Sequence, residues 1–465
     1  MEDTICAIAT PPGEGGIGIV RVSGPEARSI MDRVFVPAKA VEILPRVLTY
    51  GHVFDGDTAV DEVLAVYMPG PGTYTAEDVV EIDCHGGSVP LYRTLRLVMA
   101  SGARLAEPGE FTKRAFLNGR IDLSQAEAVM DVVGARTEEA LELAVAKLRG
   151  KYSEEIEALR KQLTDVLVEI DVNIDYPDED VEEAETEKVT SELLGIKASI
   201  DELISSARAG RIIKDGLKVA IVGRPNVGKS SLLNGLLRES RAIVTEIPGT
   251  TRDTIEEFAN IGGIPVRLTD TAGIRDTEDV VEKIGIERAK SAVKDADLVL
   301  FLIDRSEPLM EEDLEIKAGL DPAKTFIIFN KSDLSPALSD AEAGSFAAGF
   351  RHIFTSFAES GSVAAVEKLI VEYCASESSA DGPGSKPGLE AVRAGKVVTD
   401  ARHLAMLGGA SSAIGDALES LGSGAPFELV EIDLRGAYES LGFITGDSVQ
   451  DDILTEIFSR FCLGK

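Results

Sequence analysis

The sequence predicts a multidomain protein: an α+β N-terminal domain, an all-α central domain, and an α/β P-loop domain inserted into the helical one. An apolar strand at 219–222 that runs into the glycine-rich loop 223–230 and then into a helix-like stretch indicates the inserted domain. Before residue 118, short β-branched runs alternate with glycine-rich turns. Apolar residues recur at helical spacing from Leu123 onward and again after Leu389, so one helical domain brackets the inserted one.

Length and composition are those of an ordinary globular protein with two or three domains. The chain has 465 residues, 44% of them hydrophobic, and no apolar run has the length of a membrane span. The four cysteines lack metal-binding spacing and the N-terminus lacks the basic start of a secretory signal, so we expect a cytoplasmic protein without membrane contact. The formal charge of −33 disfavours general nucleic-acid binding, so any such contact needs a local basic patch or a partner protein.

The first domain is predicted over residues 1–118, with strands at 4–10, 17–24, 62–68 and 78–87 and a helix at 89–100. The helical domain is predicted over 119–210 plus 385–465, and the inserted domain over 215–378. Long helices are expected at about 152–174, 187–209 and 389–421, and a linker rich in serine, glycine and proline at 375–388.

The loop 223–230 has the pattern GxxxxGKS of a phosphate-binding loop. Its glycines allow the backbone to curl tightly, with N–H groups turned inward around the phosphates. Lys229 is expected to bind the β and γ oxygens, and the hydroxyl of Ser230 to bind Mg²⁺. A glycine-rich turn with a chance lysine is the alternative, but it does not explain why strand, loop and helix follow one another in this order.

Two later motifs select guanine and complete a GTPase domain of the Ras-like class. Asn330-Lys331-Ser332-Asp333 follows an apolar strand at 325–329 and has the NKxD arrangement. The Asp333 carboxylate can accept hydrogen bonds from both N1–H and the N2 amino group of guanine, and adenine offers no such pair of donors. Asp270-Thr271-Ala272-Gly273 is a DxxG segment at a strand end. There Asp270 can hold Mg²⁺ through water, and Gly273 can donate its N–H to the γ-phosphate.

The residue that follows DxxG is unusual for a GTPase. Many GTPases have a glutamine there that positions the attacking water, whereas this chain has the apolar Ile274. Carboxylates between 275 and 290 could supply the missing polarity, but their spacing does not single one out. The segment 245–253, with Asn226 of the phosphate loop, could bind a monovalent cation through oxygen atoms. Threonines that only hydrogen-bond within the loop are the equally weighted alternative.

The whole chain resembles the MnmE (TrmE) family of tRNA modification GTPases. The motifs that carry the resemblance are Thr4-Ile5-x-Ala7-Ile8-Ala9-Thr10-Pro11-Pro12-Gly13, Arg21-Val22-Ser23-Gly24, GEFTxRAFLNG at 109–119, GRPNVGKS, GTTRD, TDTAG and the terminal Phe461-Cys462-Leu463-Gly464-Lys465. Ribosome-assembly GTPases share the GTPase motifs but not the two ends. The resemblance implies a potassium-dependent GTPase that adds a carboxymethylaminomethyl or aminomethyl group at carbon 5 of the wobble uridine, position 34, of certain tRNAs, using a folate one-carbon unit.

The resemblance also implies ligands and partners. The expected ligands are GTP, Mg²⁺, K⁺ and 5-formyltetrahydrofolate or a related reduced folate. The expected partners are a second copy of the chain in a homodimer formed through the N-terminal domains, the flavoprotein MnmG (GidA) in a heterotetramer or larger complex, and tRNA. A ribosome-assembly or regulatory GTPase switch, in which hydrolysis only releases a partner, is the alternative.

Matching the family's motifs residue by residue assigns the site residues. The resemblance places the guanine nucleotide on Asn226, Val227, Gly228, Lys229, Ser230, Ser231, Thr245, Glu246, Ile247, Pro248, Gly249, Thr250, Thr251, Asp270, Thr271, Ala272, Gly273, Asn330, Lys331 and Asp333. It places Mg²⁺ on Ser230 and Thr251, K⁺ on Asn226, Thr245, Ile247 and Thr250, and the catalytic carboxylate at Glu282. It places the folate on Arg21, Glu81, Arg120 and Lys465, with Arg120 standing where the family often has lysine.

Overall fold

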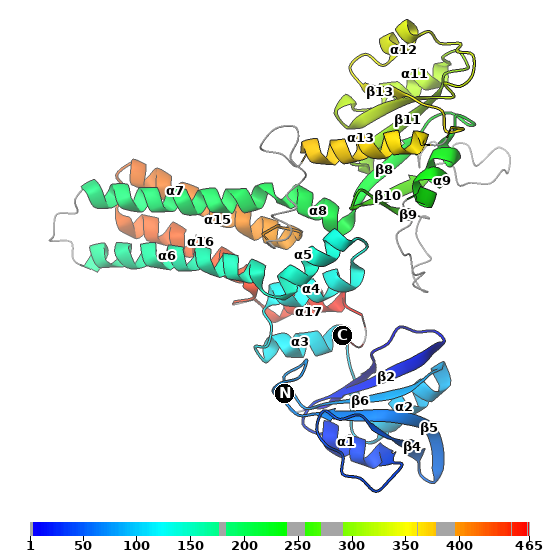
Figure 1. Cartoon of the computed structure of the whole chain (residues 1–465). Coiled ribbons are helices and arrows are strands. Elements are labelled where there is room, and N and C mark those ends of the chain that lie inside the picture. Colours follow the sequence, from blue (N-terminus) through cyan, green and yellow to red (C-terminus); the bar gives the residue numbers. More distant parts are fainter. Residues whose placement is uncertain are drawn as a thin grey trace. The chain divides into compact units, whose positions relative to one another are not determined.

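The computed structural model describes residues 3–175, 183–239, 256–270, 292–359, 361–377, 396–447, 449–462 and 464. They form two compact units, each made of segments far apart in the sequence. One unit combines Met1–Met130, Lys147–Thr190 and Asp416–Lys465, and the other combines Asp131–Ala146 and Ser191–Gly415. Each unit contains one β-sheet together with helices (Figure 1). No helix in the described ranges has both the length and the apolar character needed to cross a membrane. The limits given above for three domains stay a prediction.

The first unit begins with a seven-stranded sheet in the order β3-β4-β5-β6-β2-β1-β7. Its strands are β1 (Ile5–Ile8), β2 (Gly15–Ser23), β3 (Phe35–Pro37), β4 (Thr49–Asp55), β5 (Thr58–Met68), β6 (Val79–Gly86) and β7 (Arg104–Leu105). Neighbouring strands are antiparallel except β1 and β7, which are parallel. The strands predicted in this region are confirmed to within a few residues.

One face of this sheet is covered by α1 (Ala27–Val34) and α2 (Ser88–Ala100), whose apolar residues share a core with the strands. Val20 and Val22 of β2 belong to that core. Because side chains alternate along a strand, Arg21, between these two valines, faces the opposite side of the sheet. That opposite face carries a smaller apolar cluster of Ile5, Ala7, Ala106 and Phe111.

Helices form the rest of the first unit. The helices α3 (Glu110–Leu117), α4 (Leu123–Gly134) and α17 (Asp451–Ser459) contribute to one core cluster that includes Ala115, Leu123 and Phe458. The long helix α6 (Lys151–Asp175) packs along α16 (Phe427–Thr445). Near one end of this pair, Nη1 of Arg160 lies 2.6 Å from Oδ2 of Asp447. Since α6 spans these residues, the structure confirms the helix predicted at 152–174.

The second unit is built on a six-stranded sheet in the order β13-β12-β11-β8-β10-β9. Its strands are β8 (Leu217–Val222), β9 (Glu256–Ile261), β10 (Ile264–Asp270), β11 (Leu298–Asp304), β12 (Thr325–Asn330) and β13 (Arg351–Phe354). All neighbours are parallel except β9 and β10. Every residue of β11 and β12 is buried, as expected for central strands of a parallel sheet that is covered on both faces.

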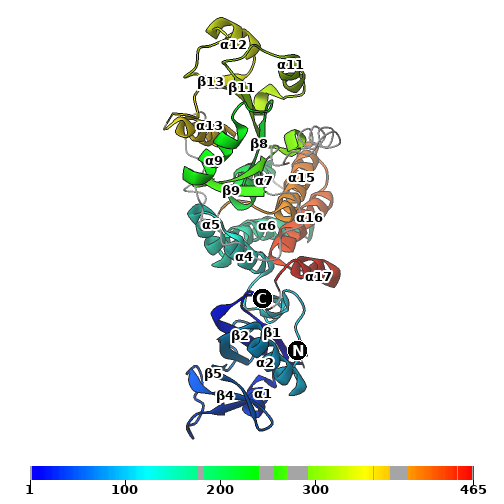
Figure 2. The same ribbon diagram turned by 90° about the vertical axis from the view of Figure 1, so that its right-hand side faces the viewer.

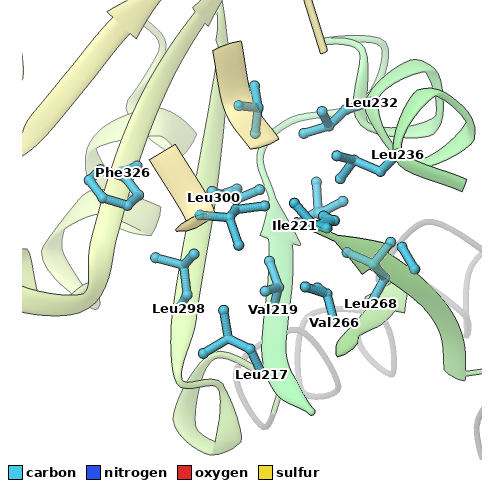
Figure 3. Packing of buried hydrophobic residues seen from close by; sticks show 14 of the residues in the cluster. Leu217, Val219, Ile221, Leu232, Leu236, Val266, Leu268, Leu298, Leu300 and Phe326 are labelled. Carbon is cyan, nitrogen blue, oxygen red and sulfur yellow. The ribbon is translucent and has the colours of Figure 1, made fainter. Parts of the chain in front are cut away.

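The two faces of this sheet have separate cores. Val219 and Ile221 contribute to one core, together with Leu232 and Leu236 of α9 (Lys229–Glu239), as Figure 3 shows. The helix α13 (Ser362–Glu377) belongs to the same layer and packs against α9 and β9 (Figure 2). The other core includes Ala220, Val222 and residues of α12 (Asp340–Phe346). The helix α11 (Glu311–Ala318) and the 3₁₀ turn η1 (Pro322–Lys324) also belong to this fold. This arrangement confirms the predicted α/β P-loop fold.

Further helices in the described ranges are α5 (Glu138–Leu148), α7 (Glu183–Ser205), α8 (Ala207–Asp215) and α15 (Ala401–Gly422). The single helix predicted at 187–209 is wrong, because α7 ends before Ser206 and α8 begins after it. The hydroxyl of Ser206 donates to the backbone oxygen of Leu203 and accepts from the N–H of Val398. This tertiary contact interrupts the helix, and apolar periodicity alone does not reveal it.

Two predicted boundaries after the inserted domain are also corrected. The helix predicted at 389–421 begins only at Ala401, since residues 396–400 are not helical. The predicted linker at 375–388 begins too early, because α13 continues to Glu377. Residues 378–395 lie outside the described part of the chain.

Candidate functional site

The glycine-rich loop 223–230 connects β8 to α9, as predicted. A Cβ atom at Gly223 would lie 2.4 Å from the backbone oxygen of Leu302, and one at Gly228 would lie 2.2 Å from Nδ2 of Asn330. Both glycines have positive φ, +145° and +109°, so a side chain there is excluded by space and by backbone conformation. Asn226 has φ +63°, in the left-handed region that asparagine tolerates. The loop therefore has the tight curl that phosphate binding requires.

Lys229 and Ser230 lie where the loop enters α9. The Nζ atom of Lys229 donates to the backbone oxygens of Gly223 at 2.6 Å and of Arg224 at 2.7 Å, so the ammonium group lies over the loop. Ser230 and Ser231 lie in the first turn of the helix, whereas Val227 is buried beneath the loop. The first turn of a helix presents backbone N–H groups and the positive end of the dipole, which together favour an anion.

The NKxD segment lies at the end of β12, beside the phosphate loop. The side chain of Asn330 donates from Nδ2 to the backbone oxygen of Val227 at 2.7 Å, and its Oδ1 accepts from the N–H of Phe357 at 3.1 Å. One buried amide thus joins the phosphate loop, the NKxD segment and the loop after β13. The predicted phosphate and base motifs form one continuous site.

At the base end the structure adds one contact to Asp333 and one residue, Asp304, that sequence reasoning missed. The hydroxyl of Ser356 donates to Oδ1 of Asp333 at 2.5 Å, which orients the carboxylate predicted to read guanine. Nζ of Lys331 lies 2.5 Å from Oδ2 of Asp304, the last residue of β11. Asp304 carried only a weak signal, since it directly follows the apolar run 298–303; the sequence does not show that this run lies beside 325–329. Ser356 lies in Thr355-Ser356-Phe357-Ala358, which occupies the place of the family's base-side motif but departs from its usual sequence, so the sequence left its contacts with guanine open.

The DxxG segment begins at the same edge of the sheet. In the parallel pairing of β10 with β8, Asp270 is opposite Ile221, close to the start of the phosphate loop. The backbone of Asp270 is described, and its side chain is not. The other predicted residues outside the described part of the chain are Thr245, Glu246, Ile247, Pro248, Gly249, Thr250, Thr251, Thr271, Ala272, Gly273, Glu282 and Lys465.

In the N-terminal sheet, two of the residues predicted for folate form an ion pair. Arg21 and Glu81 are direct partners in the antiparallel pairing of β2 with β6, and Nε of Arg21 donates to Oε1 of Glu81 at 2.7 Å. Nη1 of Arg21 donates to the backbone oxygen of Gly464 at 3.3 Å, so the end of the chain reaches this face of the sheet. The guanidinium lies 5.8 Å from the ring centre of Phe111.

Arg120 belongs to the same region through aromatic contacts. Its guanidinium lies 5.0 Å from the ring centre of Tyr74, and Tyr74 packs against the cluster that contains Phe111. The region therefore combines two guanidinium groups, a carboxylate and two aromatic rings, a set that suits a flat, polar and partly anionic ligand. Phe111 and Tyr74 were not predicted as site residues, although Phe111 lies within the GEFTxRAFLNG motif.

Comparison with known proteins gives full-length similarity to one family. The family described as "MnmE helical domain" matches residues 123–462, and "GTP-binding protein TrmE N-terminus" matches residues 4–120. The "tRNA modification GTPase MnmE" of Lactiplantibacillus plantarum is 47% identical over 100% of this chain and 98% of the relative. The protein of the same name from Alkaliphilus oremlandii is 46% identical over 100% of both chains. A solved structure of a point variant of Aquifex aeolicus Era, bound to GDP.AlF4-, is 30% identical, covers 42% of this chain and 65% of that one, and has a TM-score of 0.27.

Proposed function

The chain belongs to the MnmE family of tRNA modification GTPases, and from this premise we propose that it hydrolyses GTP to modify the wobble uridine of tRNA. The observation that carries the nucleotide half of the proposal is the Asn330 side chain, which ties the phosphate loop to the base-reading motif. In this site Lys229 binds the phosphates and Asp333, oriented by Ser356, accepts from guanine.

Two metal ions are proposed for the nucleotide site. Mg²⁺ is held by Ser230 and Thr251, and K⁺ by Asn226, Thr245, Ile247 and Thr250. Among the described members of these sets, Ser230 and Asn226 retain solvent access and offer the oxygen ligands that Mg²⁺ and K⁺ prefer. At this place a K⁺ ion would supply positive charge against the negative charge that develops on the phosphates during hydrolysis. Glu282 takes the role of the glutamine that Ile274 cannot fill, by orienting the attacking water.

A reduced folate is proposed for the face of the N-terminal sheet that carries Arg21 and Glu81. The ion pair between these residues is only partly exposed, which suits polar recognition of a pterin ring. Arg120 and Lys465 supply further positive charge. 5-Formyltetrahydrofolate or a related reduced folate would supply the one-carbon unit for carbon 5 of the uridine, and the flavoprotein partner would supply the two electrons that a formyl carbon needs to become a methylene.

The proposed working form is a cytoplasmic homodimer that acts with the flavoprotein MnmG (GidA) on tRNA. The formal charge of −33 supports a need for a partner, because the chain as a whole repels the tRNA backbone. The decisive experiment is mass spectrometry of wobble nucleosides from cells that lack this protein. Loss of the carboxymethylaminomethyl and aminomethyl uridines is expected. Unchanged nucleosides would favour the regulatory or ribosome-assembly switch.

The potassium and folate parts have separate tests with the full-length protein. GTP hydrolysis is expected to be faster in KCl than in NaCl of the same ionic strength, and equal rates would remove the potassium site. Glu282→Ala is expected to keep GTP binding and lose turnover; persistent hydrolysis would assign the role to another carboxylate. Arg21→Ala is expected to weaken binding of 5-formyltetrahydrofolate measured by calorimetry, with GDP binding as the internal control.

A further inference from the structure

The segment 304–313, which runs from the last residue of β11 into the first turn of α11, forms ion pairs with both ends of the nucleotide site. At its start, Asp304 pairs with Lys331 of the NKxD motif at 2.5 Å. At its end, Oδ2 of Asp313 lies 2.9 Å from Nε of Arg224 in the phosphate loop. The two ends of the site are therefore connected through one short segment as well as through Asn330.

Asp304 is held rigidly. It is 2% exposed, and its Oδ1 accepts from the backbone N–H of Ser306 at 2.9 Å and from the Ser306 hydroxyl at 2.6 Å. Burial alone would raise the pKa of this carboxyl, but the hydrogen bonds from Lys331 and Ser306 outweigh burial and lower it. Lys331 has φ +62°, so the Asp304 carboxylate pairs with a residue whose backbone is in the left-handed region, which a lysine seldom adopts.

Asp313 is equally fixed, on a helix. It is fully buried, and its Oδ2 accepts from the backbone N–H of Met310 at 3.0 Å, which caps α11. Arg224 has a second partner in Glu307, at 3.1 Å from Nη2. The guanidinium, with 11% of its side chain exposed, is directed to α11.

The ion pair of Arg224 with Asp313 matters because another contact that holds the phosphate loop comes from Lys229, which also has to bind phosphate. Lys229 donates to the loop's own carbonyls at Gly223 and Arg224. A phosphate that recruits this ammonium group competes with those hydrogen bonds to the loop. The pair of Arg224 with Asp313 then remains to keep the loop in its curled conformation.

We propose that Asp304 and Asp313 are positioning residues of the nucleotide site, Asp304 for the base-reading turn and Asp313 for the phosphate loop. The inference rests on the proposed guanine-nucleotide site. Neither carboxylate needs to touch the nucleotide, since each acts through the basic residue that it holds. The two ends of the site are predicted to respond separately to loss of their own anchor.

The test measures dissociation constants of GDP and IDP for the full-length protein by calorimetry. IDP lacks the N2 amino group that Asp333 reads, so the ratio of the two constants reports on the base end alone. Asp304→Asn is expected to weaken GDP about tenfold and IDP about threefold, which lowers the guanine preference by about threefold. Asp313→Asn is expected to weaken both nucleotides by the same factor, on the order of tenfold, and to leave the ratio unchanged.

Asp340→Asn is the matched control. Asp340 forms an ion pair with Arg305 of the same segment but is 81% exposed, so both constants are expected to stay within about twofold of wild type. A guanine preference that survives Asp304→Asn, or one that changes in Asp313→Asn, overturns the inference. Unchanged GDP affinity in either variant overturns it as well.

Removing one partner of a buried ion pair can destabilise the fold, so milder variants accompany the test. Ser306→Ala removes one hydrogen bond from Asp304, and Glu307→Gln removes the exposed partner of Arg224. Ser306→Ala is expected to change the two dissociation constants in the same direction as Asp304→Asn, but less. Glu307→Gln is expected to do the same relative to Asp313→Asn. If neither variant changes the dissociation constants, the proposal is contradicted. If the wild-type protein binds GDP no better than ADP, the proposed nucleotide site itself fails.

Discussion

Glycine at position 228 is a steric requirement of the phosphate loop. An added Cβ would lie 2.2 Å from the Asn330 amide, which joins the two halves of the site. Gly228→Ala must displace either the loop or that amide, so GDP affinity is expected to fall by a factor on the order of 100. Calorimetry measures the affinity. The control is Gly344→Ala in α12, where an added Cβ meets nothing within 4 Å, and its GDP affinity is expected to be unchanged.

The cysteines differ in reactivity because they differ in burial. Burial raises the pKa of the Cys6 thiol to about 12 and that of Cys84 to about 11, and Cys374 is also buried. Cys462 is exposed. With a thiol reagent at pH 8, the native protein is expected to react rapidly at Cys462 alone, and the urea-unfolded protein at all four cysteines. Peptide mapping of the labelled site checks this, and rapid labelling of Cys84 in the native protein would contradict it.

At the scale of elements, α8 depends on a close approach of two backbones. A Cβ at Gly210 would lie 2.1 Å from the backbone oxygen of Val398, so this part of α8 and the segment 397–398 fit together only with glycine. Gly210→Ala is expected to lower the free energy of unfolding by about 2 kcal/mol or more through overpacking. Urea denaturation followed by circular dichroism measures the effect.

Gly408→Ala provides the comparison for that prediction. Gly408 lies in α15, is exposed, and has space for a Cβ. Alanine there is expected to stabilise the protein by about 0.5–1 kcal/mol, because glycine costs backbone entropy in a helix. Two glycine-to-alanine changes in helices should therefore have opposite signs, and equal signs would show that space at Gly210 is not limiting.

The elements that sequence alone predicted well are those whose burial is regular. β12 is buried along its whole length, and α6 has an uninterrupted apolar stripe, so pattern and structure agree. The break at Ser206 was missed because it depends on a hydrogen bond from Val398, which is far away in the sequence. Such tertiary contacts do not change the spacing of apolar residues along the sequence, so the spacing cannot predict them.

The same distinction applies to the site. Lys229, Asn330 and Asp333 were predictable because their motifs fix residue type and spacing together. Asp304 and Asp313 were not, since a carboxylate that acts through a lysine or an arginine is one acidic residue among 80 in this chain. Only the fold shows that β11 ends beside β12 and that α11 directs a buried carboxylate to Arg224.

At the scale of the whole molecule, two electrostatic effects oppose each other as the pH falls. The formal charge of −33 at pH 7 makes the folded chain repel itself, and this repulsion declines toward the sequence pI of about 4.5. The loss of native ion pairs acts in the opposite direction. In the folded state the carboxyl pKa values of Asp304 and of Asp3, which is paired with Arg104, are lowered. A lowered folded pKa means that the unfolded chain binds more protons as the pH falls. The stability from these pairs is therefore complete above the unfolded pKa near 4 and is lost below it.

The urea midpoint in low salt is accordingly expected to hold or rise from pH 7 to about pH 5.5 and to fall below about pH 4. Added NaCl separates the two effects, because it screens the long-range repulsion between exposed charges more than it screens the partly buried pairs. In 0.5 M NaCl the change between pH 7 and 5.5 should flatten, and the loss below pH 4 should persist. A midpoint that keeps rising at pH 3.5 would show that relief of repulsion outweighs the native ion pairs.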